Sequence, residues 1–501
     1  MLTNNQDLYP KKKRINYTIL ILLLSIISSS LCISLILIFD NTRPSIYNLI
    51  WMLPLTFALI CIAILNQGHV LFYRISSLLV ISVYFIRMVI SPLVMFLGNY
   101  STFGSGYYLY AYLDNAILLM CYEAIVVFTF LIYKISNLKN SNNPIIQINN
   151  KSKVRHKIKL PILFKFIVFG LISFIILLIL SDPTLLRSNF LFLIGTSEDW
   201  QIQENYASLS GGGSGTLGIL VTLLNTVFWL VQALLPPIIM LKIVQMKVPY
   251  FYKLFLSLLL LSAVMLISTE TRAHSIEVAL TLVIIMIVLY GRRFTKFIPL
   301  LMITIVYITI SGLFAKSGME FSFEELSKTL TAYFSGPQNV AVAIGAAKDY
   351  SSLGIAMIPA DIFMKIPYLS SFFEPMFKET TNTIFNVAYA AMEGRYIGQI
   401  IPSVGQGYAY FGFLLAPIIP CLAVWIAISF EKRARDTSNI VFKFIFYMGT
   451  IMMARVTVLS NMLSGVNYLF NIILTLLIAY ISFKLIKMDK GTIRNKKWIL
   501  E

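Results

Sequence analysis

The sequence predicts an all-α polytopic integral membrane protein with about twelve transmembrane helices and one large extracytoplasmic loop. Three observations lead to this fold class. Hydrophobic residues make up 58% of the 501-residue chain and charged residues only 12%, whereas about a quarter of a soluble domain is charged. Apolar runs long enough to cross roughly 30 Å of hydrocarbon recur along the chain. The basic clusters between these runs all fall on one side of the membrane once the runs are counted.

The apolar runs give the predicted helices in order. They lie at about 15–39, 48–65, 75–97, 111–133, 161–180, 215–241, 250–268, 274–290, 297–315, 407–430, 438–458 and 464–483. The first run follows the basic residues 11–14 and so looks like the start of a secretory signal. It is too long for that, and no small-residue cleavage site precedes Asp40, so we expect a retained first helix.

Basic residues orient the chain, because Lys and Arg near helix ends resist translocation. The clusters lie at 11–14, 134–159, 292–296, 432–435 and 484–497. Together they place both termini in the cytoplasm. The formal net charge of +18 is then explained by topology, so nucleic-acid binding need not be invoked.

Two segments outside the cytoplasm are longer than hairpin connections. Segment 181–215 ends in Gly-Gly-Gly-Ser-Gly, and we expect a mobile loop that could cover a site. Segment 316–405 opens with an acidic amphipathic stretch, which we expect to be a helix on the membrane surface. The predicted parts are a membrane domain at 1–315, the large loop at 316–405, and a second membrane domain with a cytoplasmic tail at 406–501.

Four arginines lie on the side of the membrane where cations are disfavoured. These are Arg87, Arg272, Arg395 and Arg455. A buried arginine costs several kcal/mol unless it meets an anion or a water-filled cavity. A phosphate or diphosphate would fit the planar guanidinium group. The alternative is internal ion pairing that locks helices together, with Glu123, Glu270 or Glu277 as the partner.

The densest polar cluster lies at 268–277, between two apolar runs. A tight turn there would place the amide donors of a helix N-terminus beside Arg272 and His274, which favours an anion, and Glu270 lies in the same turn. His274 and Glu277 share a helix face, so one could tune the other for proton transfer. The alternative is that a hydroxyl side chain caps the helix and His274 is hydrated.

A second polar cluster, at 392–412, is rich in glycine, tyrosine and glutamine. Glycine lets the backbone approach a ligand closely, and tyrosine offers a flat face and a hydrogen bond to a sugar. Residues with the same chemistry are Tyr333, Gln338, Asn339, Tyr389, Tyr396, Tyr408 and Tyr410. The alternative is that the aromatic residues only anchor the chain at the membrane interface.

No metal or other cofactor is implied by the sequence. No Asp-x-Asp pair lies in a plausible site, and arginine can supply the charge stabilisation that a metal gives elsewhere. The cysteines Cys32, Cys61, Cys121 and Cys421 lie in predicted spans without metal-type spacing, so we expect them to pack as apolar residues.

The chain resembles the Wzy-type polymerases of O-antigen and capsular polysaccharide. The resemblance rests on Thr269-Glu270-Thr271-Arg272 before an apolar helix, on the long outer loop, and on the segment Ile401-Pro402-Ser403 to Tyr408-Ala409-Tyr410-Phe411-Gly412. It covers the whole chain as architecture and two short segments as sequence. It implies a GT-C-like membrane fold and the joining of repeat units carried on undecaprenyl diphosphate, at the outer face of a bacterial cytoplasmic membrane. Flippase and chain-length regulator proteins are the implied partners.

The resemblance also implies roles for particular residues. Arg272 would bind the leaving diphosphate and Arg395 its second phosphate, while Tyr408 and Gly412 match an aromatic-glycine pattern that serves the acceptor sugar or helix packing. The reaction needs a base for the acceptor hydroxyl and cations for the departing diphosphate. The candidates for the base are Glu393, His274 and Asp361.

Three other functions remain open. A Wzx-like flippase would handle the same lipid-linked oligosaccharide, but it would show similar halves and short outer loops. An O-antigen-ligase-type transferase has the polymerase layout, although its histidine late in the large loop is missing, because the only histidines are His69, His156 and His274. The third is a transporter of a small anion.

Overall fold

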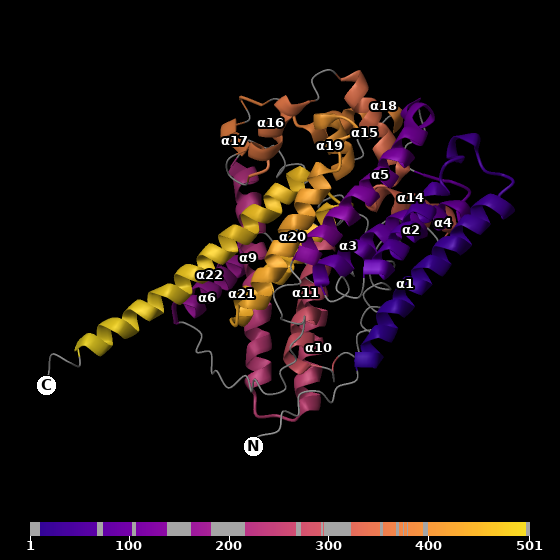
Figure 1. The fold of residues 1–501 in the computed structure, drawn as a ribbon. Helices are drawn as coiled ribbons and strands as arrows, with labels where there is room; N and C mark the ends of the chain where they lie inside the picture. Colours follow the sequence, from indigo (N-terminus) through magenta and orange to yellow (C-terminus); the bar gives the residue numbers. More distant parts are fainter. Residues whose placement is uncertain are drawn as a thin grey trace.

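The computed structural model describes a helical protein (Figure 1). The described residues are 11–67, 74–102, 107–137, 162–181, 216–266, 272–291, 294, 322–350, 354–366, 370–373, 375–377, 379–393 and 399–496. Over these residues the regular secondary structure is helical, with turns between the helices, and no strand is present among them.

The first part of the chain forms a bundle of apolar helices. They are α1 (Lys11–Ser34) with its π-helical extension η1 (Leu35–Phe39), the 3-10 turn η2 (Ser45–Tyr47), α2 (Met52–Gln67), α3 (Ile75–Phe85), the π-helical turn η4 (Ile86–Ile90), α4 (Ser91–Leu97) and α5 (Tyr107–Asn137). The turn η4 joins α3 and α4 into one rod, and it carries Arg87. Such π-helical turns in a helix are frequent at functional sites.

The remaining long helices form the rest of the bundle. They are α6 (Ile162–Ser181), α9 (Thr216–Gln245), α10 (Tyr250–Leu266), α11 (Arg272–Tyr290), α20 (Ile418–Asp436), α21 (Ile440–Val456) and α22 (Met462–Lys496). α20 packs against α5 and α3, and α21 packs against α3, α9 and α11. The two predicted membrane domains therefore contact each other along their helices.

Six helical segments are long and apolar enough to cross a membrane, by length and composition over the described residues. They are Ile19–Phe39, Ser45–Asn66, Ile75–Leu97, Tyr108–Asn137, Asn225–Gln245 and Met462–Phe483. Shorter apolar helices lie at Tyr250–Met265 and His274–Tyr290. This confirms a polytopic membrane protein but does not confirm the predicted count of twelve, and the run at 297–315 lies outside the described residues.

The structure corrects the span predicted at 407–430, which is not one helix. A short helix ends at Phe411, Gly412 follows with a φ of 75°, and α20 begins only at Ile418. The intervening turn folds back closely, since a Cβ atom on Gly407 would lie 2.1 Å from the carbonyl oxygen of Ala416. The apolar run at 407–430 predicted one helix because hydrophobicity alone does not report this turn.

The predicted large loop folds into short helices that gather at one end of the molecule (Figure 1). We call them the cap: α14 (Phe323–Tyr333), α15 (Pro337–Asp349), the 3-10 turn η5 (Ile355–Met357), α16 (Ile358–Phe363), α17 (Ser370–Phe373), α18 (Thr381–Glu393) and α19 (Ser403–Phe411). Helix α15 is the centre of the cap, because it packs against α5, α18 and α19. Its residues from Pro337 to Ala346 are buried.

Helix α14 is amphipathic, as the sequence predicted. The Ser322 hydroxyl accepts a hydrogen bond from the Glu325 N–H at 3.2 Å, which is the geometry of an N-cap. Lys328 pairs with Glu324 and Glu325 on one side. The opposite side carries the buried Ser327 and packs against α4, so α14 is a docked part of the cap.

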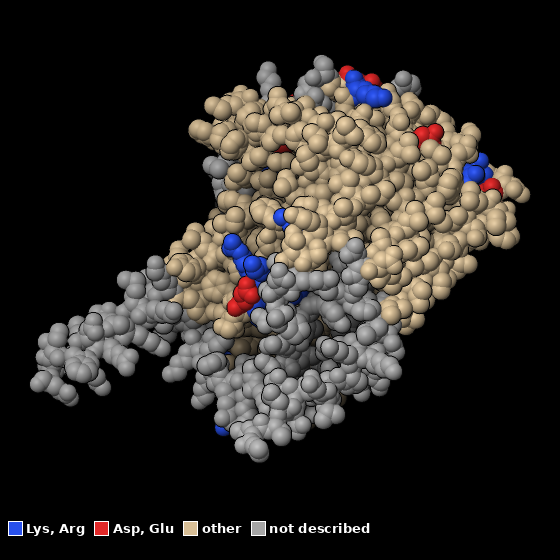
Figure 2. All heavy atoms as spheres, viewed as in Figure 1, with Lys and Arg blue, Asp and Glu red and all other residues tan. Residues whose placement is uncertain are grey.

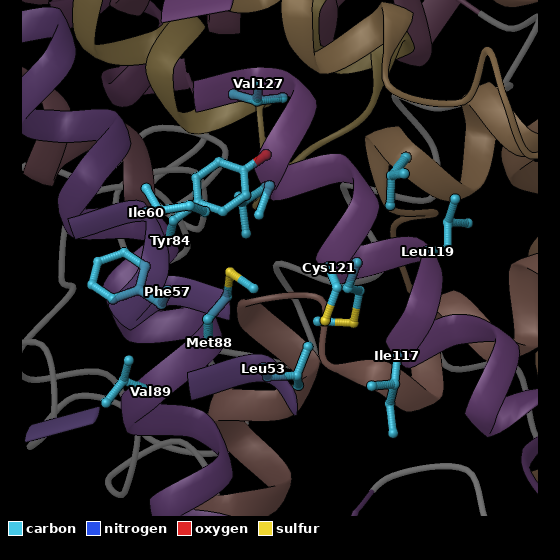
Figure 3. Close-up of a cluster of buried hydrophobic side chains, with 14 of the residues drawn as sticks. Leu53, Phe57, Ile60, Tyr84, Met88, Val89, Ile117, Leu119, Cys121 and Val127 are labelled. Atoms are coloured by element: carbon cyan, nitrogen blue, oxygen red, sulfur yellow. The ribbon is translucent and has the colours of Figure 1, made fainter. Parts of the chain in front are cut away.

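Two hydrophobic cores hold the bundle together. The first lies among α1 to α5, where Leu53, Phe57 and Met88 are fully buried (Figure 3). The second lies among α9, α10, α11, α21 and α22. Three of the cysteines are buried and Cys421 is half-buried, which confirms their apolar packing role. On the face shown in Figure 2, the described charged side chains are few and lie in small separate groups.

Candidate functional site

Three groups of described charged side chains lie at the cap end of the bundle, apart from the buried Glu431 near the C-terminal end of α20. One group contains His274 and Glu277 of α11 together with Arg455 of α21. A second contains Arg87 and Glu123. A third, inside the cap itself, contains Asp361. Their hydrogen bonding decides which of them is free to act on a ligand.

The first group brings together three residues that the sequence analysis proposed as separate candidates. The Arg455 Nη1 atom lies 2.7 Å from the Glu277 Oε1 atom. The other carboxylate oxygen, Oε2, lies 3.6 Å from the His274 Nδ1 atom. That separation allows attraction to a protonated imidazole but is too long for a hydrogen bond. We call His274, Glu277 and Arg455 the α11 cluster.

Two aromatic rings enclose the α11 cluster. The Trp229 indole of α9 stacks on the His274 imidazole, with ring centroids 5.4 Å apart and planes 20° apart. The Arg455 guanidinium lies 5.4 Å from the centroid of the Tyr468 ring of α22, which suits a cation–π contact. Stacking holds the imidazole plane in a fixed direction.

The α11 cluster keeps unused hydrogen-bonding capacity. His274 and Glu277 are buried, yet neither ring nitrogen of His274 nor the Glu277 Oε2 atom has a hydrogen-bond partner among the described residues. Buried polar atoms are nearly always hydrogen-bonded in folded proteins. An imidazole held by stacking, with both nitrogens available, can accept a proton from a ligand or donate one to it.

The start of α11 adds to this chemistry. The helix begins at Arg272, so its unpaired amide donors belong to the same first turn as His274. The Arg272 side chain is not among the described atoms, and Glu270 lies outside the described residues. The predicted helix is confirmed from Arg272 onward, and the predicted turn before it lies outside the described residues.

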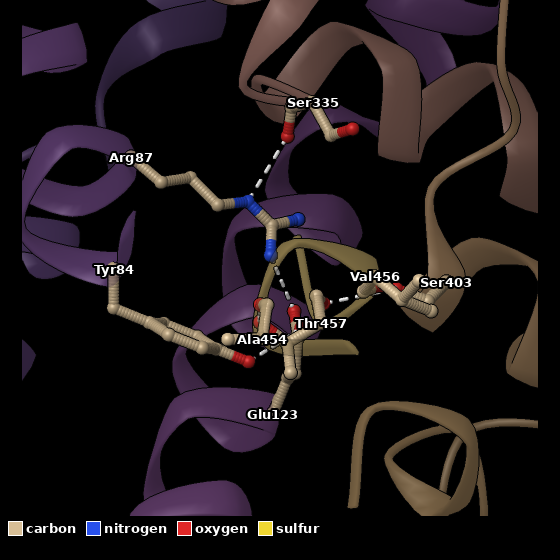
Figure 4. A network of polar contacts seen from close by, with 8 residues as sticks. All are labelled: Tyr84, Arg87, Glu123, Ser335, Ser403, Ala454, Val456 and Thr457. Carbon is tan, nitrogen blue, oxygen red and sulfur yellow. Dashed lines mark hydrogen bonds and ion pairs between the residues drawn. The ribbon is translucent and has the colours of Figure 1, made fainter. Parts of the chain in front are cut away.

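The second group is an internal ion pair (Figure 4). The Arg87 Nη1 atom lies 2.7 Å from the Glu123 Oε2 atom, with the two side chains 1% and 0% exposed. Arg87 Nε also donates to the Ser335 carbonyl at 3.0 Å, and the Tyr84 hydroxyl donates to Glu123 at 2.8 Å. Internal pairing, the alternative to an anion site, is therefore what the structure shows for Arg87, and Arg455 pairs with Glu277 in the same way. A substrate contact by either arginine stays a prediction.

The third group surrounds Asp361 of α16. Its carboxylate accepts hydrogen bonds from the Thr381 N–H at 2.9 Å and from the Gln406 Nε2 atom at 3.1 Å, and it also accepts from the Thr381 and Tyr410 hydroxyls. Burial, together with the neighbouring Asp361 charge, raises the pKa of the Tyr410 phenol, so Tyr410 remains a donor. A carboxylate that already accepts this many bonds is poorly suited to take a substrate proton, which favours an organising role for Asp361.

The other residues predicted to bind substrate fall in three places. Asn339 is inside the cap, where its Oδ1 atom accepts from the Tyr389 hydroxyl at 2.7 Å, and Gln338 beside it is also fully buried. Tyr408 is half-buried on α19. Glu393 ends α18, with a side chain outside the described atoms, and Arg395 and Tyr396 lie outside the described residues. None of these is brought to the α11 cluster by the described structure.

Sequence reasoning missed the two aromatic residues of the site. Trp229 and Tyr468 lie inside apolar runs on α9 and α22, far along the chain from His274. No local spacing connects them to the cluster, because their approach depends on how the helices pack.

These features define an all-helical, polytopic membrane protein with a buried acid–base and cation cluster near a helical cap. Comparison with family models, with curated proteins and with solved structures finds no match to this chain.

Proposed function

We propose that this protein polymerises undecaprenyl-diphosphate-linked oligosaccharide repeat units into O-antigen, capsular polysaccharide or exopolysaccharide. The reaction is a glycosyl transfer at the outer face of a bacterial cytoplasmic membrane. The resemblance of the sequence to Wzy-type polymerases gives the substrate class and the GT-C-like fold, and the α11 cluster gives the chemistry.

The observation that carries the proposal is the α11 cluster. Glycosyl transfer from a diphosphate needs a base near the acceptor hydroxyl and positive charge near the departing diphosphate. His274 supplies a buried base whose ring nitrogens have no hydrogen-bond partner among the described residues, in the first turn of the helix that begins with Arg272. A base and a cationic helix end on one helix match these two requirements.

The proposed step runs as follows. The acceptor sugar hydroxyl attacks the anomeric carbon of the growing glycan while its proton passes to His274. The new carbon–oxygen bond forms as the bond to the phosphate oxygen breaks, and undecaprenyl diphosphate leaves. Arg272, with Arg395 as the second cation, stabilises the negative charge that develops on the diphosphate.

His274 is a better candidate for the base than the carboxylates of Asp361 and Glu277. Asp361 is already the acceptor of several hydrogen bonds within the cap. Glu277 has one oxygen held by Arg455 at 2.7 Å, so its charge is already neutralised by a cation. We assign Glu277 and Arg455 to positioning His274 and the end of α11, and we leave Glu393 as the other candidate base.

The test uses a host that lacks this protein, complemented with the wild type, with Arg272→Ala or with His274→Gln. The measurements are the glycan chain-length profile and the exposure of lipid-linked repeat units at the outer leaflet. We expect single units to reach the outer face and not to be extended, with a transfer rate roughly 10²- to 10⁴-fold lower for His274→Gln.

Glu325→Gln is the matched control, because it alters one partly exposed ion pair of the cap, away from the α11 cluster, and should leave polymer length unchanged. Repeat units that stay on the cytoplasmic side would instead identify a flippase. Normal polymer that is only absent from its final acceptor would identify a ligase-type transferase.

A further inference from the structure

One edge of the cap exposes apolar side chains. In segment 354–377 the side chains of Ile355, Phe372 and Met376 are 63%, 67% and 69% exposed. Lys365 is the one exposed charged residue among the described residues of this segment. Large exposed apolar side chains that gather on one surface mark an interaction site.

The patch is built on a fixed base. Helix α16 turns Asp361 inward, where Thr381 and Gln406 hydrogen-bond to it. Two residues later Phe363 points outward and stacks on Phe373, with ring centroids 4.6 Å apart. The hydrogen bonds and the stacked rings hold the exposed side chains in place.

The patch adjoins the side of the bundle that faces lipid. Helix α16 packs against α22, and α22 packs against α6. These two long helices expose apolar residues on their outer sides, among them Phe169, Leu180, Ile473 and Leu477. In Figure 1, α16 and α17 lie at the edge of the cap on the side toward which α22 and α6 extend.

We infer that segment 354–377 is a lipid-contact segment that lies in the interfacial layer of the bilayer on the cap side. Phe363, Phe372 and Met376 enter the boundary between headgroups and acyl chains, and Lys365 extends toward the lipid phosphates. The occupant of the patch is the phospholipid bilayer, because the patch continues the apolar surface of the membrane helices. This inference does not rest on the proposed function.

The contact has a consequence for the cap. Asp361 links α16 to α18 and α19 by hydrogen bonds. Lipid bound to the outer side of α16 therefore also restrains the position of α18 and α19 relative to the membrane helices.

The test places the photoreactive residue p-benzoylphenylalanine at Phe372 in the full chain, reconstituted in nanodiscs of phosphatidylcholine and phosphatidylglycerol. The matched control carries the same residue at Lys348, which is exposed on α15 in the cap. After irradiation, mass spectrometry identifies what is joined to the label. We expect phospholipid adducts at position 372 in several-fold excess over position 348.

A second variant with the label at Met376 covers the case in which the change at position 372 disturbs the ring contact with Phe373, which lies 5.1 Å away. Lipid adducts at either position, in protein that elutes as the wild type does, support the inference. Equal yields at the patch and at Lys348, crosslinks to residues 182–215 of the same chain, or crosslinks to a second copy would each overturn it.

Discussion

The buried pair of Arg87 and Glu123 gives the sharpest test of how charge is used inside this bundle. Both side chains are almost completely removed from solvent, at 1% and 0% exposure, and their charged atoms are 2.7 Å apart. Removing one partner leaves an uncompensated buried charge, which typically costs about 3–5 kcal/mol. We therefore expect Arg87→Met and Glu123→Met each to lower the free energy of unfolding by that amount.

The double variant should recover most of the loss, because replacing a buried ion pair by apolar residues of similar size is often close to neutral. The assay is equilibrium unfolding of the purified protein in detergent, analysed as a double-mutant cycle, with polymer length measured in the same variants. Losses that simply add in the double variant would refute the ion-pair reasoning. A stable double variant that makes no polymer would instead indicate that Arg87 or Glu123 contacts the substrate.

Three further predictions concern stability and are measured by the same unfolding assay. Glu431→Ala should cost about 1–3 kcal/mol, because this buried carboxylate of α20 accepts hydrogen bonds from two backbone N–H groups at the start of α3. The control Glu325→Ala in the cap should cost less than about 1 kcal/mol. Equal losses would contradict this prediction. Gly407→Ala should cost about 1–3 kcal/mol, because the new methyl group would clash with the backbone of Ala416. Gly170→Ala should not lower stability, because a Cβ atom there meets nothing within 4 Å. A tolerated Gly407→Ala would show that the turn after α19 can move. Tyr410→Phe should lose about 1–3 kcal/mol by removing a donor from the cap carboxylate, and a neutral result would mean that this bond is replaced by water.

The sequence predicted the fold class because apolar runs and charge placement are local properties. The spans that begin near Ser45, Ile75 and Met462 agree with the runs read from composition. The break between α19 and α20 could not be read in the same way. It contains Gly412 and Pro417 but no polar residue, and the turn depends on a close approach of Gly407 to the Ala416 carbonyl that only the folded chain creates.

The candidate site was predictable only in part. His274 and Glu277 lie three residues apart, so a shared helix face followed from helical geometry. Their approach to Arg455 was one of several possible pairings, and the choice among the acidic partners needed the packing of α11 on α21. Trp229 belongs to a third helix and had no signal at all in the sequence.

The cap is joined to the membrane helices by hydrogen bonds, in addition to the packing of α15 on α5 and of α14 on α4. Arg87 Nε donates to the Ser335 carbonyl at 3.0 Å, and the Ser403 hydroxyl contacts the carbonyls of Val456 and Thr457 at 2.6 and 2.9 Å. The Met462 N–H donates to Gln406 at 2.7 Å and Asn461 to Asn382 at 3.1 Å, both at the start of α22.

Breaking these bonds together would cost on the order of 3–7 kcal/mol, at about 0.5–1.5 kcal/mol each. Such a cost keeps the cap docked in nearly all molecules. His274 contacts Trp229 of α9 and Glu277 of its own helix, so lifting the cap would not by itself expose it. A lipid-linked substrate of the proposed reaction would therefore reach the α11 cluster from the side, between membrane helices. The proposed reaction then requires a carrier lipid to move within the bilayer until its diphosphate reaches the start of α11.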